Sequence, residues 1–500
     1  MGIPSYFNHI LKNHGSILVN IEKVACHYFF IDANSIVYDS LREIELVKSN
    51  QQIYDHVYNK ILNMVKQNNP SFKTYVCFDG LPPLPKIMQQ KQRRFKSQFT
   101  NKVLNTHSSS WNTNQITPGT DFMNELDDYF VNKFKKTKNI VFSGPKEHGE
   151  GEHKIREIIQ GNKDFQRKNC VIYGLDADLI MLGLILTTYD HNIFLSKETS
   201  HFSYIPKVDD KKNYYFNLMK LGSEIYNIIK SKNWKQSILD YCFICFFCGN
   251  DFTPHLPSVN LRHNGIDRLI ESYLKTKTKE MINKNNLKIN WSNVREFIYI
   301  LKEDEQQKIK ENIIWKMKMK NRIKVFNFED KLNNLPVMDN EKERYLLNNM
   351  NEYNDYILEQ DDPTQVCLNY IEILEWTWYY YIGRNINNTI YYKYNYGPLF
   401  KDLCNYIPIT NEETVVKEVK SKDINEITQL YYVLPYEDHA KIIPKKLHDL
   451  TCETVYCYFD NLKNPHYDID YFLCRYFWES HFHFYNDDIH SVNNIITKMI

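Results

Sequence analysis

Residues 170–184 read CVIYGLDADLIMLGL, and this stretch decides the fold that we expect. Its first four residues are apolar or aromatic, which is typical of a short buried strand. A Gly-Leu turn and two acids follow, and then a longer apolar run predicts a helix. The runs 28–31, 74–78 and 140–142 are similar β-rich segments followed by polar residues and a helical pattern. This alternation predicts βα units on a mostly parallel sheet with flanking helices.

Composition places the chain among ordinary globular proteins. Of 500 residues, 43% are hydrophobic and 25% are charged, which excludes a mainly disordered or fibrous chain. The longest apolar runs, such as 242–248, are far shorter than the ~20 residues that span a bilayer. The N-terminal residues lack the basic and apolar regions of a signal peptide. We therefore expect a soluble, cytoplasmic protein.

Eleven cysteines, an odd number, favour reduced thiols in the cytosol. Cys242, Cys245 and Cys248 form a CxxCxxC run that resembles half of an iron–sulfur or zinc site. Phe and Ile residues surround them, and no second Cys/His cluster completes such a site. We predict a buried helix in which cysteine acts as a small hydrophobic residue.

Three regions are expected along the chain. Residues 1–273 hold the alternating pattern and form the α/β domain. Residues 274–342 are rich in Lys and Asn, as in KMKMKNRIK, and predict a helical or partly flexible connection. Residues 343–500 form a second, smaller and mainly helical region, densest at EILEWTWYYYIGR, which we expect to pack against the first.

Acids follow the expected strands at five places. In parallel sheets the ligand site lies beyond the carboxyl ends of the strands. Two of the five places carry acids at i and i+2, and we expect extended backbone there to point both side chains to one face. The acids are Asp32, Asp79, Glu150, Glu152, Asp176, Asp178 and Asp251.

Such a cluster predicts a site for hard divalent cations. Carboxylates brought together without cations repel one another, and Mg²⁺ or Mn²⁺ resolves this because both prefer oxygen ligands. Two such ions about 4 Å apart are the known arrangement for phosphodiester cleavage. The alternative is that these acids only cap or favour helix N-termini, as Asp32 in DANS or the pair in GEGEHK would. Acids at all five places favour the metal site.

A basic helix is expected after Asp79. The turn LPPLP ends at Pro85, and KIMQQKQRRFKSQF follows with helical spacing. Its Lys and Arg side chains suit a terminal phosphate, because Arg supplies forked donors and Lys a point charge. The alternative is a solvated basic face. The residues on the face in question are Lys86, Gln90, Arg93 and Arg94.

Together these residues resemble the Xrn/Rat family of 5′-to-3′ exoribonucleases. The motifs that carry the resemblance are MGIPSYF, FIDANSIVY, FDGLPPLPKIMQQKQRRFKSQF, ITPGTDFM, GEGEHKI, YGLDADLIMLGL and CGNDFTPHLP. Weaker similarity continues through ERYLLNNM, EILEWTWYYYIGR, YKYNYGPLF, QLYYVLP and FWESHFHFYNDDI. The resemblance implies a Rossmann-like or PIN-like core of the flap-nuclease type, and a catalytic core without further C-terminal domains.

The resemblance also implies an activity. The seven acids match the family's metal ligands, and the basic helix residues match its pocket for a 5′-monophosphate. The implied reaction is Mg²⁺-dependent hydrolysis of 5′-monophosphorylated, decapped single-stranded RNA to 5′-mononucleotides in cytoplasmic RNA decay. The decapping machinery is then a conceivable partner, and the composition suits a large DNA virus or an A/T-rich protist.

Two departures concern how RNA bases stack. Tyr38 stands where the family has a His that stacks on the first base, and Tyr retains a ring for stacking. The family's SWxW stretch is replaced by residues 387–390, so Tyr391 or Tyr392 would have to supply the opposite wall.

Two other classes of function remain open from the residues. One is a flap-type 5′ nuclease on structured DNA, which would share the acidic core but lacks a recognisable duplex-binding motif here. The other is an RNA-end-binding scaffold without turnover, against which the full set of acids argues.

Overall fold

The computed structural model describes residues 3, 5–105, 111–174, 176–196, 213–358, 362–384, 387–411, 414–416, 424–485 and 488–500. None of the helices described there is both long enough and apolar enough to cross a membrane.

In the described part of the chain, seven strands form one sheet in the order β1-β7-β6-β5-β2-β3-β4. The pairs among β2 to β6 are parallel, while β7 runs antiparallel to β6 and to β1. The mostly parallel sheet expected from the sequence is therefore confirmed. The strands are β1 (Leu18–Asn20), β2 (Tyr28–Asp32), β3 (Thr74–Cys77), β4 (Ile140–Ser143), β5 (Asn169–Tyr173), β6 (Asn192–Ser196) and β7 (Tyr214–Asn217).

The strand order places a switch point beside β2. The chain moves from β2 to β3 and β4 on one side, and β5 and β6 lie on the other. Connections that leave in opposite directions open a crevice at the carboxyl ends of the strands. Asp32 ends β2, and Asp176 follows β5 closely. These two acids therefore flank the crevice.

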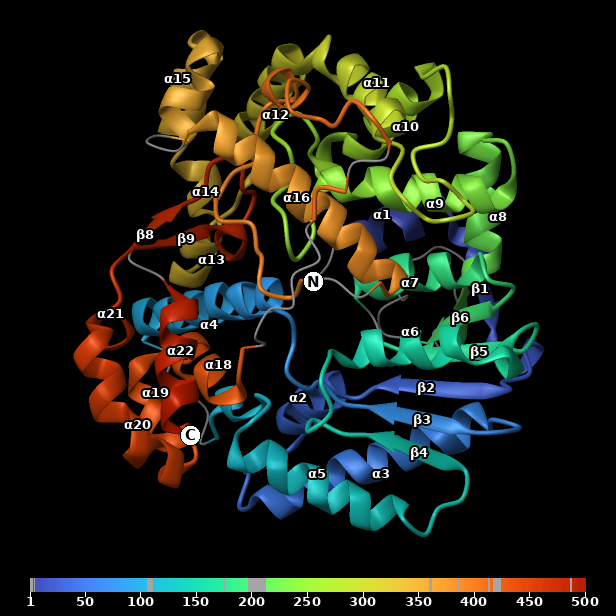
Figure 1. Ribbon diagram of the computed structural model, residues 1–500, viewed down its shortest axis with the longest axis vertical. Helices are drawn as coiled ribbons and strands as arrows, with labels where there is room; N and C mark the ends of the chain where they lie inside the picture. The colour runs from blue at the N-terminus through green and yellow to red at the C-terminus, as the bar shows by residue number, and fades with distance from the viewer. Residues whose placement is uncertain are drawn as a thin grey trace.

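Helices cover both faces of the sheet (Figure 1). On one face, α2 (Asn34–Glu43), α3 (Asn50–Asn68) and α5 (Asp121–Phe134) bury an apolar layer against the strands. On the other, α6 (Gly151–Gly161) and α7 (Ala177–Thr187) pack with α1 (Tyr6–Asn13) and several later helices. The outcome is a helix–sheet–helix sandwich, because each face of a parallel sheet must be covered.

The cysteine-rich segment lies in the second of these cores. Cys242 and Cys245 belong to α9 (Trp234–Cys245), and Cys248 ends the short helix η6 (Phe246–Cys248). All three are free thiols and fully buried. The prediction of a buried helix is confirmed.

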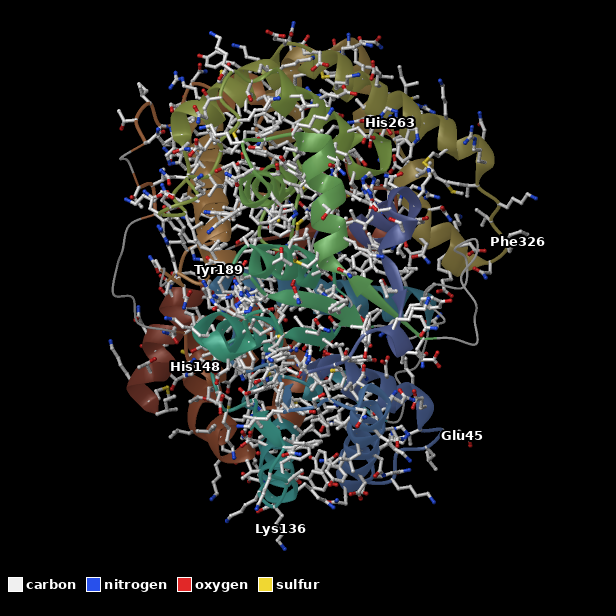
Figure 2. All side chains as sticks on the ribbon, turned by 90° about the vertical axis from the view of Figure 1, so that its right-hand side faces the viewer. Glu45, Lys136, His148, Tyr189, His263 and Phe326 are labelled. Carbon is white, nitrogen blue, oxygen red and sulfur yellow. The ribbon has the colours of Figure 1, made fainter. Side chains whose placement is uncertain are left out.

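The Lys/Asn-rich stretch is folded into helices and contributes to the core through Trp291 and Phe297. Figure 2 shows side chains filling the layers, with Glu45 and Lys136 at the surface and Phe326 projecting outward, 82% exposed. The helices after the sheet begin with α8 (Leu218–Ile229), α10 (Gly265–Lys275), α11 (Trp291–Lys302), α12 (Glu305–Met319), α13 (Phe328–Asn333), α14 (Leu335–Met338) and α15 (Glu341–Asn348).

The C-terminal region packs against α4 (Leu84–Leu104), the basic helix, which lies at mid-height on the left of Figure 1. A two-stranded antiparallel sheet of β8 (Tyr467–Asp470) and β9 (His481–Phe484) interrupts the helices. The second, mainly helical region packed on the first is thus confirmed. Its helices are α16 (Pro363–Ile382), α17 (Phe400–Leu403), α18 (Glu426–Val433), α19 (Tyr436–Ile442), α20 (Lys445–Tyr458), α21 (Asp460–Lys463) and α22 (Ile489–Met499).

Candidate active site

The acid pairs sit at helix starts rather than on extended strands. Glu150 is the N-cap of α6 and Asp176 the N-cap of α7, while Glu152 and Asp178 lie in the first turns. The expectation that extended backbone aligns each pair is therefore wrong. Neither N-cap side chain makes a capping hydrogen bond. The alternative that these acids only cap helices is wrong as well. The carboxylates of Glu150 and Asp178 accept hydrogen bonds from tyrosines of another helix instead.

Asp79 is held by groups from two neighbouring elements. Asn34 Nδ2 donates to Asp79 Oδ2 at 2.6 Å, and Gly151 N donates to Asp79 Oδ1 at 2.6 Å. The Asp79 amide in turn donates to Asn34 Oδ1 at 3.1 Å. A Cβ on Gly151 would lie 2.7 Å from Asp32 Oδ1, so only glycine lets α6 start this close to β2.

Two tyrosines of α16 reach the carboxylates from the second region. Tyr380 donates its hydroxyl to Glu150 Oε2 at 2.7 Å, and Tyr381 donates to Asp178 Oδ1. Neither tyrosine is predicted as a site residue from the sequence, although both stand in the stretch EILEWTWYYYIGR. Trp376 and Trp378, in the same helix, are fully buried and serve as scaffold.

Lys86 lies among the acids. Its Nζ is 2.6 Å from Glu150 Oε1 and 2.7 Å from Asp251 Oδ2. Burial opposes its charge, yet these carboxylates raise the pKa of Lys86 well above its usual value. Burial by itself would raise the pKa of Asp251, but the Lys86 ammonium holds it below its usual range. The acids therefore do not gather without any cation, because Lys86 is paired with two of them.

One ammonium does not balance the cluster. Burial, followed by the charges of Asp79 and Asp176, raises the pKa of Asp32 well above its usual value. Burial and then Glu150 raise the pKa of Asp79 to about 6.

The pKa values of Glu152 and Asp178 are raised in the same way. Burial and then Asp178 raise the pKa of Glu152 well above its usual value. Burial and then Asp251 raise the pKa of Asp178 to about 6. The acids named in these two paragraphs form one electrostatically linked set, and it contains all seven that the sequence singled out.

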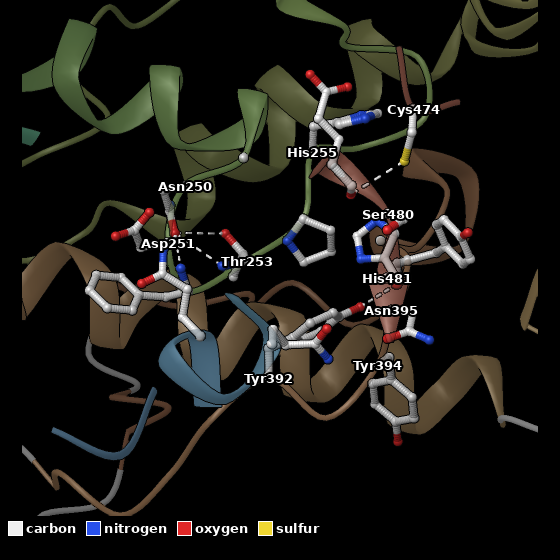
Figure 3. Close-up of a pocket in the computed structure, with 18 of the residues that line it drawn as sticks. Asn250, Asp251, Thr253, His255, Tyr392, Tyr394, Asn395, Cys474, Ser480 and His481 are labelled. Carbon is white, nitrogen blue, oxygen red and sulfur yellow. Dashed lines mark hydrogen bonds between the residues drawn. The ribbon is translucent and has the colours of Figure 1, made fainter. Parts of the chain in front are cut away.

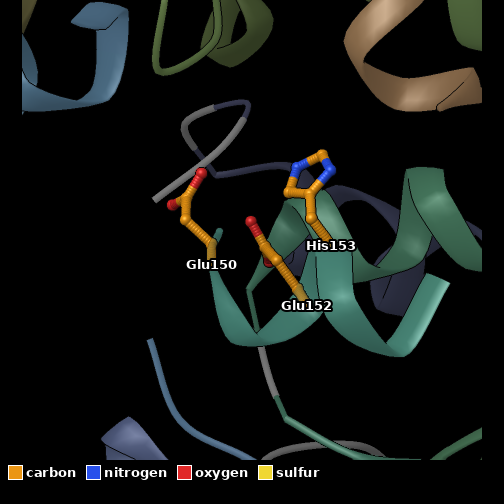
Figure 4. Close-up of side chains that lie close together, drawn as sticks. All are labelled: Glu150, Glu152 and His153. Carbon is orange, nitrogen blue, oxygen red and sulfur yellow. The ribbon is translucent and has the colours of Figure 1, made fainter. Parts of the chain in front are cut away.

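A histidine joins the cluster. Ligand atoms of Glu150, Glu152 and His153 all lie within 4.8 Å of one another (Figure 4). Burial lowers the pKa of His153 well below its usual value, so the ring is neutral and can act as a ligand. The ring packs on Tyr380 with centroids 3.7 Å apart. His153 is not predicted as a site residue from the sequence, although it directly follows Glu152 in GEGEHK.

The donors present fit a divalent metal of the hard class. Carboxylate oxygens predominate, and burial together with neighbouring carboxylates raises the pKa of four of the acids although Lys86 lies among them. A bound cation removes this repulsion and favours the ionised carboxylates. The residues that would hold it are the seven acids, with His153 beside them.

The remaining residues of the basic face lie farther along α4. Gln90 Oε1 accepts from Gln429 Nε2 at 3.0 Å, and Arg94 Nη2 donates to Thr117 Oγ1 at 2.6 Å. Arg94 Nη1 is buried without a hydrogen-bond partner among the described residues. Burial lowers the pKa of Arg94 to about 10, which leaves it charged at neutral pH. Arg93 is exposed.

Tyr38 is 38% exposed, and its ring is therefore available for contact. On the opposite wall, the replaced stretch contacts the start of α4, where Leu84 N donates to the Asn388 carbonyl at 2.9 Å. Tyr391 and Tyr392 are half-buried. The roles assigned to these side chains remain predictions.

The fold and site define a class: an α/β protein with a buried carboxylate cluster at a sheet switch point, as suits metal-dependent phosphodiester chemistry. Two family models match the chain. "XRN 5′-3′ exonuclease N-terminus" covers residues 1–198, and "Xrn1 helical domain" covers residues 231–340. The chain belongs to the XRN 5′-3′ exonuclease family, whose members are hydrolases.

Curated relatives agree with this assignment. 5′-3′ exoribonuclease 1 of Saccharomyces cerevisiae is 29% identical over 317 residues, covering 55% of this chain and 20% of that protein. The Homo sapiens protein of that name is 28% identical over 318 residues, covering 55% and 18%. 5′-3′ exoribonuclease 2 of Schizosaccharomyces pombe is 30% identical over 321 residues, covering 51% and 32%. The matches thus span about a fifth to a third of these relatives.

Among solved structures, the catalytic core of Rad2 in complex with DNA aligns at 12% and 13% identity, with TM-scores of 0.33 and 0.35. These alignments cover 71% and 72% of this chain, and 86% and 88% of those chains. At such scores the similarity carries no argument about function.

Proposed function

We propose that this chain is a Mg²⁺-dependent 5′-to-3′ exoribonuclease that hydrolyses 5′-monophosphorylated RNA to 5′-mononucleotides. The observation that carries the proposal is the linked set of seven acids, in which burial and neighbouring carboxylates raise the pKa of Asp32, Asp79, Glu152 and Asp178. Divalent cations would relieve the repulsion within this set. Two Mg²⁺ ions are proposed, with Mn²⁺ as a substitute. Membership of the XRN family supports RNA rather than DNA as substrate.

The metal ions would supply an activated water and stabilise the leaving oxygen. This chain's own residues position their ligands. Asn34 and the Gly151 amide orient Asp79, and Tyr381 orients Asp178. Lys86 keeps Asp251 ionised and ready to serve as a ligand.

End selection is assigned to α4. Arg94 carries a buried guanidinium nitrogen that lacks a partner in the described structure, and such a donor suits a phosphate oxygen. Arg93, one residue before it, is exposed and supplies a second forked donor. Gln90 is proposed as a further contact, and Lys86 as a link between the phosphate and the metal ligands. Tyr38 is proposed to stack on the first base.

The biological setting follows from the proposed substrate. Decapped RNA carries a 5′-monophosphate, so we assign the chain to RNA decay in the cytoplasm. The decapping machinery would then supply the substrate.

The test compares matched RNAs with a 5′-monophosphate, a 5′-hydroxyl or a 5′-triphosphate, with and without Mg²⁺, beside a DNA flap substrate. We expect rapid decay of the first RNA only, and only with Mg²⁺. Equal rates on the three RNA ends would refute the phosphate pocket. Preference for the DNA flap would favour the flap-nuclease alternative, and no turnover of any substrate would favour an end-binding scaffold.

A double variant then isolates the phosphate contacts. Arg93→Ala/Arg94→Ala should lose tenfold or more of the rate on 5′-monophosphate RNA, since a charge-assisted hydrogen bond contributes about 1.5–3 kcal/mol. Its rate on 5′-hydroxyl RNA should hardly change. Lys135→Ala/Lys136→Ala, at the exposed end of α5, is the control with the same loss of charge. If both RNA ends weaken together and in step with added salt, α4 is only a basic surface.

A further inference from the structure

A cavity of about 580 Å³ adjoins the acid cluster, and most of its lining residues do not belong to that cluster. Only Asp251 among the seven acids, and Arg93 from the basic face, contribute to its wall. The size falls within the range of about 300–1,000 Å³ that is usual for small-molecule sites. Figure 3 shows His255 and His481 reaching its interior from different segments, with Tyr394 and Asn395 nearby.

The cavity lies on a different side of α4 from the proposed phosphate contacts. Gln92, which lines the cavity, exchanges hydrogen bonds with Phe482 of β9, with Phe482 N donating to Gln92 Oε1 at 2.9 Å. Gln90 and Arg94 face α18 and Thr117 instead. Arg93 stands between these two sides. A group held at Arg93 is therefore beside both the acid cluster and the cavity.

The wall combines flat rings with hydrogen-bonding groups. Tyr394 and Trp478 offer ring faces, and His255 and His481 offer imidazole nitrogens. Burial lowers the pKa of His481 to about 3, and burial also lowers the pKa of His255. Both rings are therefore neutral at pH 7, and each carries one donor and one acceptor. His255 Nδ1 donates to the Leu256 carbonyl at 3.2 Å, so His255 offers a ligand its acceptor Nε2. Such groups suit the edge of a nucleobase better than a phosphate.

Apart from Glu479 Oε1, which is ion-paired with Arg262, three polar atoms of lining residues are buried without a hydrogen-bond partner in the described structure. They are Gln89 Oε1, Asn250 Nδ2 and Ser480 Oγ. Ser480 is only 2% exposed. Unsatisfied buried groups of this kind are costly and favour a ligand that supplies the missing partners.

The charges favour a mononucleotide over a longer strand. A strand needs a row of cations along its backbone. Among the described lining residues, Arg262 is paired with Glu479 at 2.5 Å, and Lys96 donates to the Trp478 carbonyl at 2.9 Å. Lys91 Nζ lies over the rings of Tyr432 and Phe484, 3.9 Å and 4.4 Å from their centroids. Arg93 and Lys393 are the lining cations whose side chains show no ion pair, hydrogen bond or ring contact in the described part of the chain. That is enough for one phosphate.

We propose that this cavity is a binding site for a nucleoside 5′-monophosphate, the product of the reaction. The inference rests on the proposed function, since that reaction leaves a mononucleotide whose phosphate is held on α4 beside Arg93. The base swings into the aromatic wall while the phosphate stays beside Arg93, so Gln90 and Arg94 become available to the next nucleotide but Arg93 does not. The bound product thereby slows the following turnover when it accumulates.

The test measures inhibition of RNA decay by AMP. His481→Phe keeps the ring but removes its hydrogen bonds, and it should weaken AMP inhibition at least tenfold. KM for 5′-monophosphate RNA and the single-turnover rate should stay within twofold. His490→Phe, at an exposed position of α22 outside the cavity, is the matched control and should leave AMP inhibition unchanged. Tyr394→Leu is the second variant, used if the melting temperature shows that His481→Phe is misfolded.

The outcomes separate the alternatives. Unchanged AMP inhibition in both cavity variants overturns the proposal, as does an AMP constant that responds to Arg94→Ala but not to His481→Phe. A KM for a 20-nucleotide RNA that rises tenfold, with AMP inhibition unchanged, shows instead that the cavity holds the RNA strand. If no RNA is degraded, the proposed function fails. Calorimetric titration of AMP into wild type and His481→Phe then tests the cavity by itself.

Discussion

Gly151 provides a sharp test of how closely the acid cluster is packed. In Gly151→Ala the new Cβ would lie 2.7 Å from Asp32 Oδ1 and 3.0 Å from the Cys77 carbonyl oxygen. Ordinary contact begins at 3.4 Å, so the first distance is about 0.7 Å too short. The Cys77 carbonyl is backbone that accepts from Ala33 N at 2.9 Å and cannot easily move. The Asp32 side chain must therefore give way.

Two effects of different size follow. Overpacking of a close-packed site costs about 1–3 kcal/mol, which lowers the melting temperature by a few degrees in a chain of this length. Displacing a metal ligand by most of an ångström should reduce RNA decay much more, on the order of 100-fold. The assay is decay of 5′-monophosphate RNA with Mg²⁺, together with thermal melting of the same preparation.

Gly161→Ala is the matched control, because it is the same change at the other end of α6. A Cβ there meets nothing within 4 Å. Alanine also favours the helix by about 0.5–1 kcal/mol, so this variant should be fully active and at least as stable as wild type. If Gly151→Ala melts and cleaves like Gly161→Ala, the close approach of α6 to Asp32 is refuted.

Two other predictions concern charge. Asp178→Asn should nearly abolish RNA decay while leaving melting without divalent ions unchanged or higher, because burial and then the Asp251 charge raise the pKa of Asp178 to about 6. Activity within threefold of wild type would refute the metal assignment. Asp240 is buried on α9, and burial raises its pKa to about 7 although Tyr273 donates to it at 2.6 Å. Because the folded pKa lies above the unfolded value, its stabilisation is complete below about pH 4 and is lost as pH rises to about 7, by about 1.4 kcal/mol per unit. Asp240→Asn should remove this slope from melting curves between pH 5 and 7, and an unchanged slope would contradict it.

The local sequence pattern alone predicts the parallel strands, most of the acids that follow them and the basic helix. The strands before Asp32, Asp79 and Asp178 are readable because β-rich runs alternate with helical segments, and this rhythm depends on neighbours in sequence. The rule that ligands bind at the carboxyl ends of parallel strands then selects six of the seven acids. Asp251 follows the helix η6, so the expectation that it follows a strand is wrong. The basic helix is readable for the same reason, since residues at i, i+4, i+7 and i+8 share one face.

Only the tertiary structure decided the rest. The edge of the sheet depends on β1 pairing with β7, which joins Val19 to Tyr215 across most of the α/β domain. Tyr380 and Tyr381 reach the acids from a helix more than 200 residues later in the chain. No local pattern marks such contacts, because they arise when separate elements bury their apolar faces against each other.

The backbone at the acid pairs shows most clearly what residue spacing cannot predict. The i, i+2 spacing of Glu150 and Glu152 fits a strand and a helix start equally well, and it was the packing of α6 against β2 that selected the helix. Lys86 likewise has the spacing of a phosphate contact, yet it forms ion pairs with Glu150 and Asp251. Spacing determines which side chains share a face, and the tertiary structure determines what that face meets.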